Sequence, residues 1–339
     1  MRIDPAVEDI LSRVLEGREL KKEDALQLMD VKIHSPEMYM LMAVADGLTR
    51  SRFDNFGEVH AQIGINYAPC PNKCEFCVFS VADKSIEFSL EEVVERAKWF
   101  VDEGANAIFL MTTADYEFDK YVEIGRAVRE AIPTDMPLVA NIGDFGVSEA
   151  KELIDAGFTA VYHVVRLREG VDTKIDPSDR LRTIRAAKSV GLDLSYCVEP
   201  IGPEHTPEEI VDAMFLGKEL NPKVMATMRR IAVPGTPLSK YGQITQVEQA
   251  KIEAITRLVF ANSNILAMGV HEAYKPCLMA GANQIYAETG PNPRDQAIDT
   301  TRGRGFTVAK CRELLWEAGY TPREGGTPAL QGPLRELKP

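Results

Sequence analysis

Three cysteines close together are the strongest chemical signal in this chain. Cys70, Cys74 and Cys77 stand in a C-x3-C-x2-C run, and three thiolates at this spacing can bind one metal centre. A [4Fe-4S] cluster normally takes four thiolates, so a cluster held here would leave one iron open to a small molecule that binds through nitrogen and oxygen. A structural zinc site is the alternative, but it usually needs a fourth Cys or His nearby. The next histidine downstream is His163, so the spacing favours an iron–sulfur cluster with a reactive iron.

The segments around the cysteine run have the pattern of repeated βα units. From about residue 60, short apolar segments alternate with amphipathic segments at helical spacing. We expect eight strands, at residues 62–67, 107–112, 137–141, 159–165, 193–198, 225–232, 265–270 and 283–287. We expect helices at residues 89–103, 119–131, 147–156, 178–190, 206–219, 246–260, 272–280 and 307–318. The simplest architecture is a full (βα)8 TIM barrel, with the cysteine run after the first strand, at the end of the barrel where such enzymes keep their active site.

The chain length suits one barrel with added helices. Of the 339 residues, 1–58 are expected to form an N-terminal helical cap, because apolar residues recur there at helical spacing. Residues 59–320 are assigned to the barrel, which ends in a C-terminal helical extension, and residues 321–339 to a C-terminal tail. No low-complexity stretch divides the barrel.

Charge and composition exclude several classes of function. The net charge of −12 argues against nonspecific nucleic-acid binding, which needs a basic surface. The first ten residues contain no apolar core of a secretion signal, and no run is long enough to span a bilayer, so we expect a cytoplasmic protein that does not bind membranes. Six cysteines, three of them in one ligand run, fit a reducing compartment better than a disulfide framework. A homodimer is compatible with the sequence.

The cysteine run, with aromatic Phe76 before its third cysteine, resembles the signature of the radical S-adenosylmethionine (radical SAM) enzymes. The resemblance implies a [4Fe-4S] cluster on Cys70, Cys74 and Cys77, whose open iron binds the amino and carboxylate groups of S-adenosylmethionine. An electron from the reduced cluster then cleaves this cofactor to a 5′-deoxyadenosyl radical. An electron donor such as flavodoxin or ferredoxin is therefore implied, and Phe76 would lie against the adenine.

Later segments narrow the resemblance to the biotin synthase branch of these enzymes. They are residues 234–238, after the sixth expected strand, and residues 277–283, before the eighth. The branch also contains methylornithine synthase and the maturase of iron-only hydrogenase. Biotin synthases are sulfurtransferases that insert sulfur into dethiobiotin after the radical removes hydrogen from C–H bonds. The sulfur comes from an auxiliary iron–sulfur cluster.

The chain departs from the best-known biotin synthases at the auxiliary cluster. Those enzymes hold a [2Fe-2S] cluster with cysteines on strands two, three and five and an arginine on strand seven, and only Cys197 has a counterpart here. A second, anaerobe-type (type II) class is the closer resemblance, through residues 162–169, 287–295 and 303–305. Cys277 and Cys311 are the remaining cysteines, so the resemblance implies an auxiliary cluster on Cys197, Cys277 and Cys311. The alternative for the last two is plain packing, because buried helical cysteines usually behave as small hydrophobes.

Strand alternation and strand ends predict further site residues. Ser195, Cys197 and Glu199 should face the barrel lumen, because the residues between them suit the helix layer. By analogy of position, contacts to S-adenosylmethionine are assigned to Thr112, Thr113, Asn141, His163, Arg166 and Arg168. Each has an alternative: an arginine could simply pair with Glu199, Arg168 could be a solvated loop charge, and a lone histidine is more often a packing residue.

Three rival functions remain open from the sequence. A related radical SAM enzyme, similar to methylornithine synthase or the hydrogenase maturase, would share the first cluster without inserting sulfur. A non-catalytic iron–sulfur electron carrier would need four thiolates and no substrate cavity, and the eight βα units argue against it. A structural zinc protein is the third.

Overall fold

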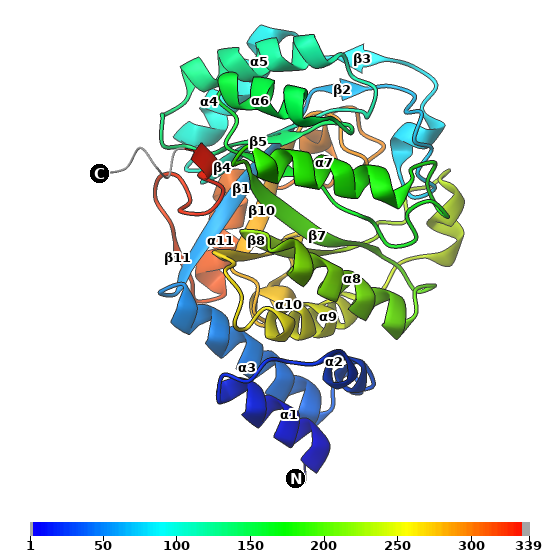
Figure 1. Ribbon diagram of the computed structural model, residues 1–339, viewed down its shortest axis with the longest axis vertical. Helices are drawn as coiled ribbons and strands as arrows, with labels where there is room; N and C mark the ends of the chain where they lie inside the picture. Colours follow the sequence, from blue (N-terminus) through cyan, green and yellow to red (C-terminus); the bar gives the residue numbers. More distant parts are fainter. Residues whose placement is uncertain (1–2, 334–339) are drawn as a thin grey trace.

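Eight parallel strands form the wall of a closed barrel in the computed structural model, which describes residues 3–333 (Figure 1). They are β1 (Phe56–Gly64), β4 (Ala107–Met111), β5 (Leu138–Asn141), β6 (Ala160–Tyr162), β7 (Asp193–Ile201), β8 (Val224–Arg229), β9 (Ala267–His271) and β10 (Gln284–Thr289). Each strand pairs in parallel with the next, and β10 pairs with β1 to close the ring. The predicted (βα)8 barrel is confirmed.

The first strand differs from its predicted bounds. It begins at Phe56, and the segment predicted as residues 62–67 breaks after Gly64 into a short strand, β2 (Asn66–Tyr67), which pairs with β3 (Ile86–Glu87). In β1 the polar Glu58, His60 and Gln62 alternate with apolar residues and are buried. These polar side chains point into the lumen, so the strand lacks the continuous apolar run by which a buried parallel strand is recognised.

Helices surround the barrel close to their predicted positions. They are α4 (Leu90–Asp102), α5 (Phe118–Ala131), α6 (Val147–Asp155), α7 (Pro177–Ser189), α8 (Pro207–Leu220), α9 (Gln246–Val259), α10 (Lys275–Leu278) and α11 (Val308–Glu317), with 3-10 turns η1 (Val78–Val81), η2 (Pro237–Tyr241) and η3 (Thr300–Arg302). Capping boxes begin several of them, with Ser89, Thr206 and Thr245 each binding the glutamate three residues on. The predicted helix at 272–280 is only four residues long, because the chain turns at Gly281, whose φ is +103°.

Three helices precede the barrel: α1 (Pro5–Leu15), α2 (Lys22–Met29) and α3 (Pro36–Arg52). They lie below the outer helices, with α2 packed on α8 and α9, and α3 on α9 (Figure 1). The buried Thr49 hydroxyl donates to the Gly281 carbonyl oxygen at 2.7 Å and accepts from Arg257 at 2.8 Å. This helical cap therefore covers the helix layer, and leaves the carboxyl ends of the strands uncovered.

The C-terminal segment closes the opposite end of the lumen. A short strand, β11 (Thr321–Pro322), pairs with the start of β1. The carboxylate of Glu58, which is 1% exposed, accepts from Arg323 at 2.7 Å and from the Thr327 hydroxyl at 2.6 Å. Residues 321–327, which the sequence assigned to a tail, thus seal the amino ends of the strands. The lumen opens at the carboxyl ends of the strands.

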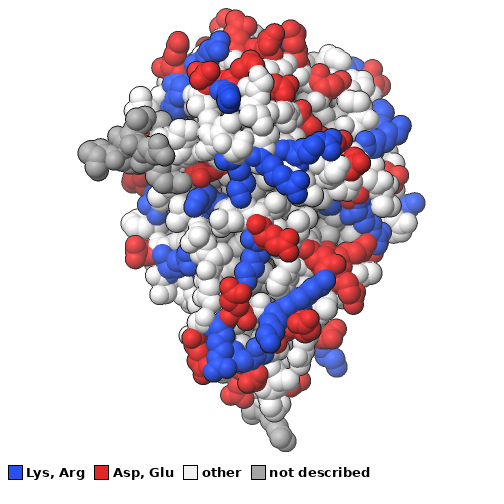
Figure 2. All heavy atoms as spheres, in the orientation of Figure 1, with Lys and Arg blue, Asp and Glu red and all other residues white. Residues whose placement is uncertain are grey.

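The surface carries both signs of charge. Figure 2 shows Lys and Arg side chains mixed with Asp and Glu over the face that it displays, without one continuous basic area. Among the described residues, no helix is long and apolar enough to cross a membrane.

Two glycines make a matched test of the close backbone approach beside β1. A Cβ on Gly64 would lie 1.7 Å from the Pro291 carbonyl oxygen, whereas a Cβ on Gly47, within α3, would meet nothing within 4 Å. We expect Gly64→Ala to lower the free energy of unfolding by roughly 1–3 kcal/mol, because backbone must move. Gly47→Ala should raise it by about 0.5–1 kcal/mol. Urea unfolding followed by circular dichroism measures both; equal effects would contradict this packing.

Candidate active site at the carboxyl ends of the strands

A cavity lies at the carboxyl ends of the strands, and the empty space in it, counted together with the open solvent at its mouth, is about 1030 Å³. It brings together most of the residues that the sequence singled out. These are Cys70, Cys74, Phe76, Cys77, Thr112, Thr113, Asn141, His163 and Arg166. Their side chains come from four stretches of the chain, namely the loops after β2, β4 and β6 and the end of β5, as expected for a barrel active site.

The cysteine loop is held at the cavity mouth by the loops after three other strands. The Glu75 N–H donates to the Asp172 carbonyl oxygen at 2.9 Å, and the Val78 N–H to that of Pro293 at 2.9 Å. The Leu238 N–H donates to the carbonyl oxygen of Glu75 at 3.1 Å. The loop is therefore fixed by backbone contacts that do not use the thiols.

The three thiols have the chemistry of a metal site. Burial raises the pKa of Cys74 to about 11 and raises that of Cys77 still more, while the charges of Arg166 and Arg180 partly lower the pKa of Cys74. Such thiols stay protonated at neutral pH until a metal displaces the proton. The donor set and its place in the cavity fit a [4Fe-4S] cluster with three protein ligands.

Two arginines lie beside Cys74 in a buried network of carboxylates. Arg166 Nε is 3.2 Å from Glu199 Oε1, and its guanidinium is 3.7 Å from Glu169. Arg180, 5% exposed, pairs with Glu169 at 3.8 Å and with Asp144 at 3.2 Å. Arg166 lines the cavity and also pairs with Glu199, the pairing that the sequence left open as its alternative. Arg180 was missed, because in sequence it is one arginine among several on an amphipathic helix.

His163 is hydrogen-bonded to a carboxylate at the cavity wall. Its Nε2 is 2.8 Å from Asp144 Oδ1, which also accepts from the Thr183 hydroxyl at 3.1 Å. Burial lowers the pKa of His163 to about 4, against the opposing effect of Asp144. Burial alone would raise the pKa of Asp144, but the His163 hydrogen bond and the Arg180 charge outweigh it, and the pKa falls to about 2. At neutral pH the pair is therefore a neutral imidazole and a carboxylate.

The two threonines after β4 differ in their freedom to bind a ligand. The Thr113 hydroxyl accepts from the Asn66 side-chain amide at 2.8 Å, and its N–H donates to the same amide at 2.9 Å. The buried Thr112 hydroxyl has no hydrogen-bond partner within residues 3–333. Thr112 is thus available to a molecule in the cavity, whereas Thr113 anchors β2.

Arg168 lies away from this cavity. Its guanidinium donates to Glu209 at 2.7 Å and 3.0 Å, and to the Glu204 carbonyl oxygen at 2.7 Å. It does not line the cavity, and its contacts join the loop after β6 to the start of α8. The structure therefore favours a loop-bracing role for Arg168.

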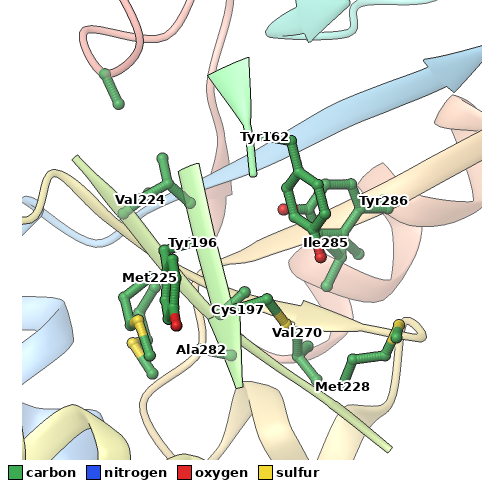
Figure 3. Packing of buried hydrophobic residues seen from close by; sticks show 14 of the residues in the cluster. Tyr162, Tyr196, Cys197, Val224, Met225, Met228, Val270, Ala282, Ile285 and Tyr286 are labelled. Carbon is green, nitrogen blue, oxygen red and sulfur yellow. The ribbon is translucent and has the colours of Figure 1, made fainter. Parts of the chain in front are cut away.

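Cys197 lies beneath the cavity floor. It is fully buried on β7, and its neighbours include the side chains of Tyr162 and Tyr286 (Figure 3). The Tyr162 hydroxyl donates to Glu199 Oε2 at 2.5 Å. Because Glu199 and Cys197 both meet lumen residues, the predicted orientation of this strand holds. Burial raises the pKa of Cys197 well above its usual value.

Cys277 and Cys311 lie outside the barrel wall. Cys277, on α10, is buried near Glu253 of α9, and Cys311 Sγ on α11 donates to the backbone carbonyl oxygen of Tyr286 at 3.4 Å. Helix α10 packs on α9, and α11 packs on β1 and β10. The structure therefore does not bring the three cysteines that were assigned to an auxiliary cluster to one site.

A ring of four charges, two buried glutamates and two partly buried arginines, flanks the cavity. Arg304 bonds Glu272 and Glu288 at 2.6 Å each, and Arg294 pairs with the same two carboxylates, at 3.2 Å for Glu272. Arg294 also lines the cavity. Residues 287–295 and 303–305 carry part of the resemblance to the anaerobe-type class, and in the structure these two segments meet in this ring.

His271, at the end of β9, also lines the cavity and was missed. It is 1% exposed, its ring stacks on Tyr286 with centroids 3.6 Å apart, and burial lowers its pKa well below the usual value. The alternation of β9 could have placed it at the lumen face.

Two family models match adjoining parts of the chain. The radical SAM superfamily matches residues 68–217, and the Biotin and Thiamin Synthesis associated domain matches residues 200–321. The chain is 28% identical over 335 residues to biotin synthase from Persephonella marina, covering 91% of this chain and 97% of that one. It is 26% identical over 321 residues to biotin synthase from Nocardioides sp., covering 88% and 84%.

Solved structures share the fold. Methylornithine synthase superposes with a TM-score of 0.80 at 17% identity, covering 93% of this chain and 97% of that one. The FeFe-hydrogenase maturase HydG from Carboxydothermus hydrogenoformans gives 0.78 at 17% identity, covering 94% and 80%. At such identities the likeness concerns the fold alone.

The depressed pKa of His163 predicts a loss of stability in acid. Below pH 6.5 the imidazole of His163 is protonated in the unfolded chain, whereas in the folded chain it stays neutral until the pH falls to about 4. The free energy of unfolding therefore falls as the pH drops through this window. The loss should be at most about 3 kcal/mol. In His163→Gln this part of the loss should vanish. Urea unfolding of both proteins, prepared without iron, at neutral and mildly acidic pH tests this; identical losses would refute it.

Proposed function

This chain belongs to the radical SAM superfamily, in its biotin synthase branch, and from that premise we propose that it is an anaerobe-type biotin synthase. The substrate is dethiobiotin, into which two C–S bonds are introduced. The observation that carries the proposal is one cavity at the carboxyl ends of the strands in which the C-x3-C-x2-C loop meets Thr112, Asn141 and Arg166, with Cys197 buried beneath its floor. The chemistry is a radical sulfurtransferase reaction.

Cys70, Cys74 and Cys77 are proposed to hold the [4Fe-4S] cluster. When bound, this cluster supplies the electron that cleaves S-adenosylmethionine to the 5′-deoxyadenosyl radical. The chain's part is to fix the loop by backbone hydrogen bonds and to place Arg166 and Arg180 beside Cys74. The charges of these arginines favour the thiolate form that a metal needs.

The cavity wall offers groups suited to each part of S-adenosylmethionine. Arg166 is proposed to pair with the carboxylate, because a guanidinium binds a carboxylate through charge-assisted hydrogen bonds. The free Thr112 hydroxyl and the half-buried Asn141 amide suit the methionine or ribose. Phe76 lines the same cavity and is proposed to lie against the adenine.

The lumen beneath is suited to keep a radical away from water. Phe109, Tyr162, His271 and Tyr286 pack their rings together there, with centroids 3.6–6.4 Å apart, and each is buried. An unactivated C–H bond is too strong for a protein acid or base, so the hard chemistry belongs to the cofactors. The barrel contributes orientation and exclusion of water.

Cys197 is proposed as a ligand of the auxiliary iron–sulfur cluster, which when bound supplies the sulfur. It is the cysteine whose side chain meets lumen residues in the described part of the chain. Cys277 and Cys311 are proposed to pack in the helix layer. A single lumen thiol fits an auxiliary cluster only if other side chains also bind it.

An external electron donor, such as flavodoxin or ferredoxin, is part of the proposal, because the first cluster must be reduced before each cleavage. A cytoplasmic, anaerobic setting is proposed because thiolate-bound iron needs a reducing compartment.

Arg166 and Arg168 provide a matched test of cofactor binding. We expect Arg166→Ala to weaken the binding of S-adenosylmethionine by roughly 10- to 100-fold, the value of one or more charged hydrogen bonds, and Arg166→Lys to recover part of it. Arg168→Ala should leave the affinity unchanged, because that guanidinium is bound to Glu209 outside the cavity. Equilibrium binding to the anaerobic, cluster-loaded protein decides; equal effects of the two alanine variants would remove Arg166 from the cofactor site.

The function is tested by an anaerobic assay with S-adenosylmethionine, a reductant and dethiobiotin. The parent should form biotin, and Cys74→Ala should form neither biotin nor 5′-deoxyadenosine. Cys197→Ala should still release 5′-deoxyadenosine but form no biotin, while the controls Cys277→Ala and Cys311→Ala should form biotin. If the fully loaded parent formed no biotin, the proposed function would be contradicted. If Cys197→Ala formed biotin at the parental rate, Cys197 would not be a ligand of the sulfur-donating cluster.

A further inference from the structure

His271 is a buried imidazole with no hydrogen-bond partner at the wall of the cavity. Neither Nδ1 nor Nε2 is paired with any residue of the part of the chain that the structure describes. The side chain is 1% exposed and lines the cavity with Met228 and Arg294. Burying an unpaired polar group costs free energy, so a native protein usually has a reason to keep one. The cavity offers that reason, since a bound group there could take a ring nitrogen.

The ring is held in place by aromatic packing. It stacks on Tyr286, with centroids 3.6 Å apart and planes 12° apart, and meets the edge of Tyr162 at 6.1 Å. Histidines that bind metals are usually oriented by a hydrogen bond from the second nitrogen. Here stacking fixes the ring plane instead, so the imidazole is oriented before any ligand arrives.

Cys197 lies in the adjoining layer of the same lumen. The strand between β7 and β9 is β8, on which Ala226 is the register partner of both Cys197 and Gly269, and Met228 is the partner of His271. A Cβ on Gly269 would be 3.2 Å from the Ala226 Cβ, so these two small residues face the same side. In the layer of Cys197, the lumen side chains on the next two strands are therefore small, namely the methyl group of Ala226 on β8 and the hydrogen atom of Gly269 on β9.

Other nitrogen and sulfur side chains of the lumen have at least one partner, although His60 Nδ1 is also unpaired and lies outside the cavity. His60 Nε2 contacts Glu58 at 3.2 Å, and Met228 Sδ accepts from Arg294 at 3.0 Å. Cys277 and Cys311 are on the helix side of the wall. Among the described lumen residues, His271 is thus the histidine with both ring nitrogens unpaired, and an unpaired imidazole nitrogen is suited to bind iron.

We propose that His271 binds the auxiliary iron–sulfur cluster through an imidazole nitrogen, as a protein ligand in addition to Cys197. The inference rests on the proposed function, because it assumes that such a cluster occupies the lumen. Imidazole replaces thiolate on one iron of some [2Fe-2S] centres, so the chemistry of the pair is sound. It explains how one lumen cysteine can suffice where the sequence offered two further thiols that the fold places elsewhere.

The test is pulsed electron paramagnetic resonance on protein carrying ¹⁴N- or ¹⁵N-labelled histidine. The Cys74→Ala background removes the first cluster, and S-adenosylmethionine is left out, so that the auxiliary cluster alone contributes in its paramagnetic form. We expect a strong nitrogen coupling that changes with the histidine isotope. A cluster signal with no such isotope-dependent coupling would overturn the proposal without any substitution at position 271.

Variants at position 271 give the second arm. His271→Ala and His271→Gln should abolish the coupling and lose iron and sulfide beyond the first cluster, whereas His60→Gln, which changes a lumen histidine outside the cavity, should keep both. Weaker binding of dethiobiotin by His271→Ala with an unchanged cluster spectrum would overturn the proposal in favour of a substrate contact. If the parent protein contained no iron beyond the first cluster, the proposed function itself would be contradicted. Iron analysis of the parent would show this before any variant is made.

Discussion

The pairing of arginines with carboxylates around the cavity is the interaction on which the rest of the site depends. Arg166, Arg180 and Arg294 all border the cavity, and each is matched by a carboxylate from a different βα unit. Where the carboxylate is buried, as in Glu199 and Glu272, removing its arginine leaves an uncompensated buried charge, at a cost of up to about 3–5 kcal/mol. The pairs therefore tie neighbouring loops together. The loop after β6, which carries Arg166 and Glu169, also receives the backbone hydrogen bond that fixes the cysteine loop.

This arrangement separates two kinds of chemistry within one barrel. The cysteine loop lies at the mouth, where Cys70 and Cys74 are partly exposed, while Cys197 lies below the floor formed by Tyr162 and Glu199. The amino ends of the strands are sealed by the C-terminal segment on Glu58. A radical made near the mouth would thus meet substrate in a lumen closed at the far end, which is what insertion of sulfur into an unactivated C–H bond requires.

The sequence predicted what depends on local pattern and missed what depends on distant contacts. Eight strands and the cysteine run are local signals, and both were found. The start of β1 was misplaced because Glu58 is buried by residues near position 327, which sequence order does not reveal. Arg180 was overlooked for the same reason, since its partners Asp144 and Glu169 lie in loops of the barrel. The alternation of β9 could have placed His271 at the lumen, but its lack of a hydrogen-bond partner is visible only in the structure. Cys277 and Cys311 were counted as ligands by number, but the wall of the barrel separates them from Cys197.

The central claim is that the sulfur of the product is held inside this barrel. The most direct measurement is a single turnover with protein whose clusters carry only heavy sulfur (³⁴S), given dethiobiotin and excess S-adenosylmethionine without free sulfide. Mass spectrometry of the biotin formed then reports the source of the sulfur. The account predicts biotin that carries the heavy isotope, at no more than one molecule per chain. Biotin with sulfur of natural isotope composition would contradict it.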